Sequence, residues 1–252
     1  SVLARPPNNL GLVGYWSFNE GTGAYAGDAS GNKNTGTLTG GPTWVDGKRG
    51  KALNFDGSDD FVNVGKRFSS MVGSSKFTIA AWVKPRVTTG TQVILKDQNS
   101  ANDTRSILFQ INSSQYEMCY YRSSGCTPVT GGPVTTNWTH VVGSWDGNTP
   151  RLYINGVQVD SDGDSNTMTS GSSLSIGRAG AASSGYFNGL IDEVRVYNRA
   201  LSAAEIQTLY QADYAKVNAP QNNQITSGLI GLWSFNGPDM SGTTAYDRSG
   251  QG

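Results

Sequence analysis

Apolar and polar residues alternate with a period of two along most of the chain, which is the pattern of strands that bury one face. Dipeptides that favour tight turns separate the alternating segments, namely Asp56-Gly57, Asp146-Gly147, Asn155-Gly156 and Asn188-Gly189. The pattern predicts an all-β, antiparallel sandwich of two sheets. The predicted strands are residues 12–18, 52–55, 77–83, 92–96, 107–111, 138–145, 151–154, 174–176 and 187–197.

One short helix is predicted after the last strand, over residues 202–210. Ser202 can accept a hydrogen bond from the first turn, and Glu205, three residues later, can complete a capping box. Residues 214–227 are polar, contain a proline and show no periodicity, so they are predicted to form a linker. The sandwich is therefore expected to be one domain of residues 11–213.

An internal repeat follows the linker. Residues 11–19, GLVGYWSFN, return as residues 228–236, GLIGLWSFN, and residues 28–32 match residues 247–251 more loosely. Residues 228–252 are thus predicted to be the first strand and loop of a second repeat. The strand needs a partner for its apolar side chains, in its own molecule or on a neighbour joined head to tail. These predicted assembly residues are Leu229, Ile230, Leu232, Trp233 and Phe235.

The charge of the chain narrows the class of partner. Of its 252 residues, 19 are Lys or Arg and 19 are Asp or Glu, so the net charge is zero. No cluster of basic residues follows a phosphate backbone, and no apolar run reaches 18 residues. We therefore expect neither nucleic-acid binding nor insertion into a membrane.

Several phrases resemble the laminin G-like domain of the concanavalin A-like lectin/glucanase superfamily. They are ALNFDGSDDFV at 52–62, FTIAAWVKP at 77–85, WTHVV at 138–142, LYING at 152–156 and IDEVRVYNRALS at 191–202. The resemblance spans about residues 11–213 and implies a jelly-roll sandwich. It also implies an extracellular or cell-surface module that binds sugars, glycans or proteins without catalysis, often with a structural calcium ion.

A calcium site is predicted at the loop of residues 28–36. Asp28, Asn32 and the backbone near Thr35 offer the hard oxygen ligands that calcium prefers. The resemblance adds Asp192, at the start of the last long strand, to this set. The alternative is a turn without metal. A second acidic group, Asp56, Asp59 and Asp60, is interpreted as turn chemistry.

Glycoside hydrolysis needs two carboxylates placed across one sugar. The four glutamates, Glu20, Glu117, Glu193 and Glu205, each lack a second acid two residues away. Asp192 and Glu193 are adjacent in a predicted strand, so they are expected to point to opposite faces and to be unable to act on one bond. The single histidine, His140, lies in an apolar strand and is interpreted as packing. The sequence therefore predicts a protein that is not an enzyme, with a glycan-active enzyme as the less favoured alternative.

The ligand is predicted to contact a tyrosine-rich hairpin. Tyr120, Tyr121 and Arg122 offer aromatic faces and a guanidinium group for a sugar. Cys119 and Cys126 flank the turn and are predicted to form a disulfide, with two free thiols as the alternative. The predicted function is calcium-stabilised carbohydrate binding or cell adhesion, and the alternative is a structural role in which the repeated strand joins neighbours.

Overall fold

The structure is a computed structural model that describes residues 9–66, 68, 71, 76–98, 107–122, 125–126, 128–162, 173–178 and 185–214, with residues 240–241 and 244–245. The chain divides into two units, Ser1–Tyr214 and Ala215–Gly252. In the second unit the described residues form one antiparallel pair, β18 (Met240–Ser241) and β19 (Thr244–Ala245). The predicted assembly residues Leu229, Ile230, Leu232, Trp233 and Phe235 lie outside the described residues.

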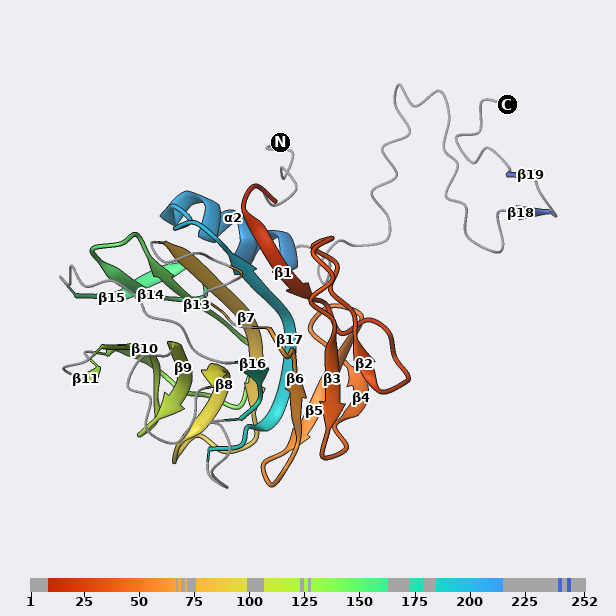
Figure 1. The fold of residues 1–252 in the computed structure, drawn as a ribbon, viewed down its shortest axis with the longest axis horizontal. Helices are drawn as coiled ribbons and strands as arrows, with labels where there is room; N and C mark the ends of the chain where they lie inside the picture. The colour runs from red at the N-terminus through yellow and green to blue at the C-terminus, as the bar shows by residue number, and fades with distance from the viewer. Residues whose placement is uncertain are drawn as a thin grey trace. The chain divides into compact units, whose positions relative to one another are not determined.

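The first unit is a sandwich of two antiparallel sheets, as predicted (Figure 1). In sheet order, the first sheet holds β15 (Val157–Ser161), β14 (Pro150–Ile154), β13 (Thr139–Trp145), β7 (Phe77–Pro85), β17 (Asn188–Tyr197), β5 (Lys51–Asp56) and β4 (Thr43–Asp46), with β1 (Leu12–Trp16) also beside β17. The second sheet holds β11 (Gly125–Cys126), β10 (Gln115–Arg122), β9 (Ile107–Asn112), β8 (Gln92–Gln98), β16 (Ser173–Ile176), β6 (Phe61–Asn63), β3 (Gly36–Thr39) and β2 (Tyr25–Ala26), with β12 (Val129–Pro133) also beside β10.

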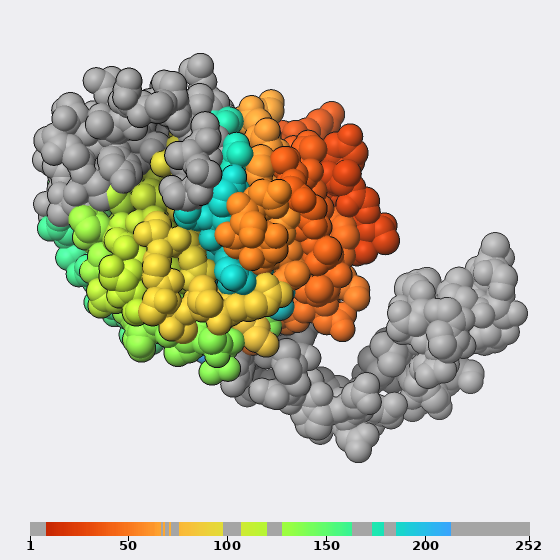
Figure 2. All heavy atoms as spheres, turned by 90° about the horizontal axis from the view of Figure 1, so that it is seen from below, coloured from red at the N-terminus to blue at the C-terminus, as the bar shows by residue number. Residues whose placement is uncertain are grey.

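The main core lies between the sheets, and the largest side chains in it include Trp16, Phe55, Phe77, Phe109 and Trp145. On the surface in Figure 2, the cyan segment of β16 and β17 runs between the orange segment of β5 and β6 and the yellow segment of β7 and β8. This order agrees with the pairing of β16 with β6 and β8, and of β17 with β5 and β7.

Strand β7 is buried on both faces, which explains its unbroken apolar run. Ile79, Ala81 and Val83 enter the core between the sheets. Ala80 instead packs in a second cluster that includes Leu209 of the helix α2 (Ala203–Tyr214). Helix α2 therefore covers the outer face of the first sheet, where it supplies a second hydrophobic layer.

Each predicted strand is present, with ends that differ by at most two residues. One turn prediction is wrong, because Asn188-Gly189 begins β17 instead of closing a hairpin. A Cβ on Gly189 would lie 2.4 Å from the backbone oxygen of Lys84. Glycine is needed there for close contact between β17 and β7, and not for a turn.

The first and the last strand of the sandwich pair with each other. One edge of β17 pairs with β7, while the other edge pairs with β5 at Asn188–Ile191 and with β1 at Val194–Tyr197. Strand β1, the first of the sandwich, therefore lies against β17, its last strand.

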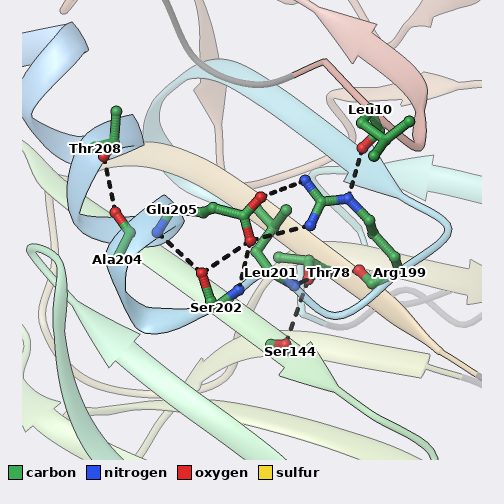
Figure 3. Close-up of polar contacts among 9 residues, drawn as sticks. All are labelled: Leu10, Thr78, Ser144, Arg199, Leu201, Ser202, Ala204, Glu205 and Thr208. Atoms are coloured by element: carbon green, nitrogen blue, oxygen red, sulfur yellow. Dashed lines mark hydrogen bonds and ion pairs between the residues drawn. The ribbon is translucent and has the colours of Figure 1, made fainter. Parts of the chain in front are cut away.

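The predicted capping box at the start of α2 is confirmed (Figure 3). Glu205 N donates to Ser202 Oγ at 3.3 Å, and Ser202 N donates to Glu205 Oε2 at 2.9 Å. Arg199 adds two hydrogen bonds to the same carboxylate, at 3.0 and 2.6 Å, and its Nε donates to Leu10 O at 2.7 Å. Arg199 thus links the Glu205 carboxylate at the start of the helix to the segment before β1.

None of the helices among the described residues is long and apolar enough to cross a membrane.

The Glu205 carboxylate is expected to make the fold less stable in acid. Hydrogen bonds from Arg199 lower the pKa of Glu205 to about 2. A lowered folded-state pKa stabilises the fold above the unfolded value near 4.5, and the contribution disappears as the pH falls toward 2. Because the Glu205 side chain is 30% exposed, we expect about 1–2 kcal/mol. Urea unfolding at pH 6 and pH 3 should show this loss in the native chain and a smaller one in Glu205→Gln; equal losses would contradict it.

Candidate functional site

Asp28 organises the loop between β2 and β3. Its Oδ1 accepts hydrogen bonds from the backbone N–H groups of Tyr15 and Ser30, and its Oδ2 accepts one from Asn34, each at 2.9 Å. Burial alone would raise the pKa of Asp28, but the hydrogen bonds outweigh it and hold the pKa below its usual value. Both carboxylate oxygens therefore already serve the fold of the loop.

The other predicted calcium ligands of this loop are exposed. Asn32 Nδ2 donates to Ser30 Oγ at 3.1 Å and to Leu12 O at 3.4 Å. Thr35 is exposed as well. The buried neighbour Asn34 uses its side-chain amide to donate to Val13 O at 2.7 Å. These amides anchor the loop to β1.

Asp192 is fully buried on β17, and its surroundings differ from those of Asp28. Its Oδ2 accepts a hydrogen bond from Arg49 N at 2.9 Å, and Gly47 lies so close that a Cβ there would be 2.6 Å from this oxygen. Its Oδ1 accepts no hydrogen bond from the described residues. Burial raises the pKa of Asp192 to about 8.

The four predicted calcium ligands thus divide into two groups. The hydrogen bonds place Asp28 and Asn32 against β1, whereas Asp192 contacts the turn between β4 and β5. A buried carboxylate oxygen without a hydrogen-bond donor suits a cation, and oxygens that accept backbone N–H groups suit it less well. By this criterion, the Asp192 carboxylate is better suited to coordinate calcium than the Asp28 carboxylate.

Glu193 and Arg195, which follow Asp192 on β17 and are buried, form a polar cluster with the half-buried Tyr15 of β1. The Tyr15 hydroxyl lies 3.0 and 2.9 Å from the two carboxylate oxygens of Glu193, and Arg195 forms an ion pair with the same carboxylate. The guanidinium carbon of Arg195 lies 4.5 Å from the Tyr15 ring centroid. Burial raises the pKa of Tyr15 to about 12, so the hydroxyl keeps its proton as a donor.

A β-bulge interrupts the predicted alternation of side chains at Asp192 and Glu193. The pairing of β17 with β7 shifts between Asp192 and Arg195, and Glu193 has a φ of 54°. A positive φ is rare outside glycine and costs about 1–3 kcal/mol. The bulge turns the Glu193 carboxylate toward Tyr15 and Arg195, so this carboxylate already takes part in a hydrogen bond and an ion pair within the fold.

His140 packs as predicted. The side chain is fully buried, and its ring centroid lies 5.1 Å from that of Trp82 and 6.0 Å from that of Tyr210 on α2. Lys48 Nζ lies 4.3 Å from the Trp82 ring centroid. The histidine thus lies in an aromatic layer under the helix.

The acidic group Asp56, Asp59 and Asp60 is the set of three carboxylates that lie within 4.8 Å of one another among the described residues. Asp56 Oδ1 accepts from Ser58 N at 2.8 Å and from Asp59 N at 3.4 Å, while Asp60 Oδ2 accepts from Asp56 N at 2.9 Å. These hydrogen bonds are those of a tight turn, in agreement with the interpretation of this group as turn chemistry.

A polar cluster beside this turn was not predicted. Arg86 Nη1 donates to Phe55 O at 3.1 Å and to Asn188 Oδ1 at 3.3 Å, and its Nη2 donates to Asn54 Oδ1. Asn188 also pairs with Asp56 across β17 and β5. No local motif marks the cluster, because its residues come from three segments far apart in the sequence.

The predicted hairpin site is described only by its backbone. Tyr120, Tyr121 and Arg122 belong to β10, and Tyr121 pairs with Cys126 of β11. Their side chains lie outside the described residues. Cys119 is buried. The ligand contacts and the Cys119–Cys126 disulfide stay predictions.

Comparison with known proteins identifies the family. The model of the concanavalin A-like lectin/glucanases superfamily matches residues 55–207, more than half of the chain. The chain belongs to this superfamily. The match runs from the end of β5 to α2, so it includes the bulge at Glu193 and the capping box. No curated protein sequence matches the chain.

Solved structures of similar fold extend the comparison. Domain 4 of AbnA, a GH43 extracellular arabinanase from Geobacillus stearothermophilus, solved in complex with arabinotriose, is 25% identical with a TM-score of 0.64; the match covers 79% of this chain and 98% of that domain. The binding domain of Paraclostridial Mosquitocidal Protein 1 is 20% identical with a TM-score of 0.65, and the shares are 80% and 52%.

A third similar structure belongs to botulinum neurotoxin type C, whose cell entry depends on two ganglioside molecules. It is 12% identical with a TM-score of 0.64, and the match covers 81% of this chain and 52% of the toxin chain. The chain thus spans about half the length of these toxin chains, which at this identity share the fold alone.

Proposed function

We propose that the first unit is a non-catalytic carbohydrate-binding module of an extracellular or cell-surface protein. The observation that carries the proposal is the match to the arabinotriose-bound arabinanase domain over nearly the whole of that domain. The family and the fold agree with this class of ligand, and the similar botulinum neurotoxin type C structure, which shares the fold, comes from a protein whose cell entry depends on two ganglioside molecules.

The buried acids support a role without catalysis. Glu193 is 1% exposed and holds Tyr15 and Arg195, and Asp192 is fully buried beneath the turn between β4 and β5. A glycosidase needs both carboxylates within reach of one glycosidic bond. Neither of these two acids can meet a sugar without unfolding of the bulge.

The sugar is proposed to bind at the hairpin of Tyr120, Tyr121 and Arg122. Isothermal titration with arabinotriose and a panel of other oligosaccharides should show saturable binding with a Kd of about 1 mM or lower. Loss of both rings in Tyr120→Ala/Tyr121→Ala should weaken binding by about tenfold or more, since each stacked ring contributes of order 1 kcal/mol.

Tyr25 offers a matched control, because it is an exposed tyrosine on β2 and is 63% exposed. Tyr25→Ala should leave the Kd unchanged. If Tyr25→Ala lost sugar binding while the hairpin variant kept it, the sugar would not bind at the hairpin. Absence of binding across the panel, or release of reducing sugar by the chain, would overturn the proposed function.

Calcium binding is proposed at Asp192, because this residue keeps a buried oxygen without a donor among the described residues. Calcium at millimolar concentration is expected to raise the Tm of the native chain relative to a chelator. Asp192→Asn, which keeps the size of the side chain and loses its charge, should remove most of the rise. If the Tm of the native chain were the same with calcium and with chelator, calcium binding would be contradicted.

A further inference from the structure

A lysine lies on the outer face of the second sheet. Backbone pairing places Lys96 of β8 opposite Leu108 of β9 and Ser175 of β16. Leu108 in turn lies opposite Cys119 of β10. Residues directly opposite on neighbouring strands share a face of the sheet. Phe109, the neighbour of Leu108, enters the core between the sheets, so Leu108 and Lys96 point to the outer face.

Polar residues continue the line on the other side of Lys96. Ser175 lies opposite Asn63 of β6, and Asn63 lies opposite Thr37 of β3. Asn63 Oδ1 accepts a hydrogen bond from Gly65 N at 3.1 Å, which leaves Nδ2 as a donor. We define the second-sheet row, which crosses the sheet from β3 to β10 (Figure 1), as Thr37, Asn63, Ser175, Lys96, Leu108 and Cys119.

Burial differs between the two sides of Lys96. On one side, Leu108 and Cys119 are buried and form an apolar cluster with the buried Val93. On the other side, the residues of β6 and β3 in the row are exposed, and Lys96 itself is half-buried. The lysine thus lies between an apolar area and a polar one, the combination that is typical of sites for small ligands.

The charge of Lys96 is unpaired within the part of the chain that the structure describes. Its ammonium group forms neither an ion pair nor a hydrogen bond there. Burial lowers the pKa of Lys96, and no nearby carboxylate opposes this effect. A half-buried cation without an anion loses hydration and gains no Coulombic attraction in return. An anion bound beside Lys96 would supply that attraction, and the apolar neighbours would strengthen it by excluding water.

The second-sheet row ends at the proposed sugar site. Its last residue, Cys119, directly precedes Tyr120 of the hairpin. Two strand spacings separate Lys96 from Cys119, which corresponds to about 10 Å between their backbones. An oligosaccharide of a few units that stacks on the hairpin is therefore long enough to extend over Lys96.

The charges on this face favour a carboxylate over a densely sulfated chain. Lys96 is the one cation of the second-sheet row, whereas heparin-like chains need clusters of basic residues. Two residues further along the strands, Gln110 lies opposite Glu117 on the same face. The Glu117 carboxylate accepts hydrogen bonds from Gln110 Nε2 at 2.8 Å and from Asn112 Nδ2 at 3.1 Å. This fixed negative charge opposes a ligand with many anionic groups.

We propose that the carbohydrate ligand of the first unit carries a carboxylate, as a uronic acid unit does, and that Lys96 binds this group. The inference rests on the proposed function and names the class of sugar. Lys96 supplies a charge-assisted hydrogen bond, while Asn63 donates to a sugar hydroxyl group. Lys96 therefore selects acidic sugars over neutral ones.

Isothermal titration with oligouronates and their methyl esters tests the charge, because an ester keeps the sugar and loses the negative charge. The panel holds trimers of galacturonate, glucuronate and mannuronate, each beside its ester, with arabinotriose as a neutral sugar. At least one acid should bind about tenfold more tightly than its ester. If neutral sugars bound and no acid bound more tightly than its ester, the inference would be overturned and the proposed function would stand. If no sugar bound, the proposed function itself would fail.

A lysine variant tests the residue. Lys96→Met keeps the apolar stem and removes the charge, so it should weaken binding of the preferred acid about tenfold and leave its ester unchanged. Binding of the ester also shows that the variant is folded. Lys84→Met is the matched control, because Lys84 is an exposed lysine on β7 of the other sheet, and it should keep the preference. A preference kept in Lys96→Met, or tighter binding of a sulfated trimer than of any uronate, would overturn the inference.

Discussion

Replacing Arg195 with methionine is expected to destabilise the first unit by about 3–5 kcal/mol. The ion pair of Arg195 and Glu193 is almost fully buried, with side-chain exposures of 4% and 0%. Removing one partner of a buried pair leaves an uncompensated charge, which costs far more than the pair itself contributes. The free energy of unfolding from urea titration, at neutral pH, measures the loss, which corresponds to a Tm lower by about 10 °C.

A paired variant separates charge from packing. Glu193→Gln/Arg195→Met removes both charges and keeps similar volumes, and the amide oxygen introduced at position 193 can still accept the Tyr15 hydrogen bond. We expect this double variant to lose less stability than Arg195→Met alone. If Arg195→Met stayed within about 1 kcal/mol of the native chain, the buried pair would not be a structural requirement of the bulge.

The sequence predicted the sandwich because its core strands follow simple rules. Strand β13 and the central part of β7 combine unbroken burial with β-branched and aromatic residues. Strand β14, which pairs with β13, is followed by the turn Asn155-Gly156 that leads into β15, and the φ values of 51° and 81° suit this turn. Local chemistry alone determines such elements.

Two strands that were not predicted as alternating segments differ in their sequence signal. Strand β15 is an edge strand whose Val157 and Val159 are exposed at 63% and 41%, so burial imposes no alternation on it. Strand β10 did carry a signal, since Tyr116 and Met118 are buried and Glu117 between them is not. The sequence predicted this segment only as one arm of the tyrosine-rich hairpin, which is shorter than the strand Gln115–Arg122.

The candidate site was harder to predict than the fold. Alternation placed Asp192 and Glu193 on opposite faces, but alternation holds only for regular strands, and the bulge with positive φ at Glu193 breaks it. Nothing local in the sequence marks that bulge, because tertiary partners stabilise it: Tyr15 comes from β1, 178 residues away from Glu193. The loop at Asp28 was predicted as oxygen-rich, but which donors its oxygens would meet depended on the packing of β1.

Asp28→Ala is expected to lower the stability of the first unit by about 2–4 kcal/mol, and to do so equally with calcium and with a chelator. The variant removes the acceptor for three backbone N–H groups, at Tyr15, Ser30 and Asn34, and the Asn34 donor belongs to a buried residue. Because hydrogen bonds alone account for the loop, the loss should not depend on an ion.

Asp28→Asn is the matched control for this loss. Its amide keeps one acceptor oxygen for Tyr15 and Ser30 but places an N–H group opposite Asn34 N, so an intermediate loss is expected. Urea unfolding of both variants, each with millimolar calcium and with chelator, gives the comparison. If calcium stabilised the native chain and Asp28→Ala abolished that effect, the loop would be the calcium site that the sequence predicted, and Asp28 would hold an ion as well as the backbone of its loop.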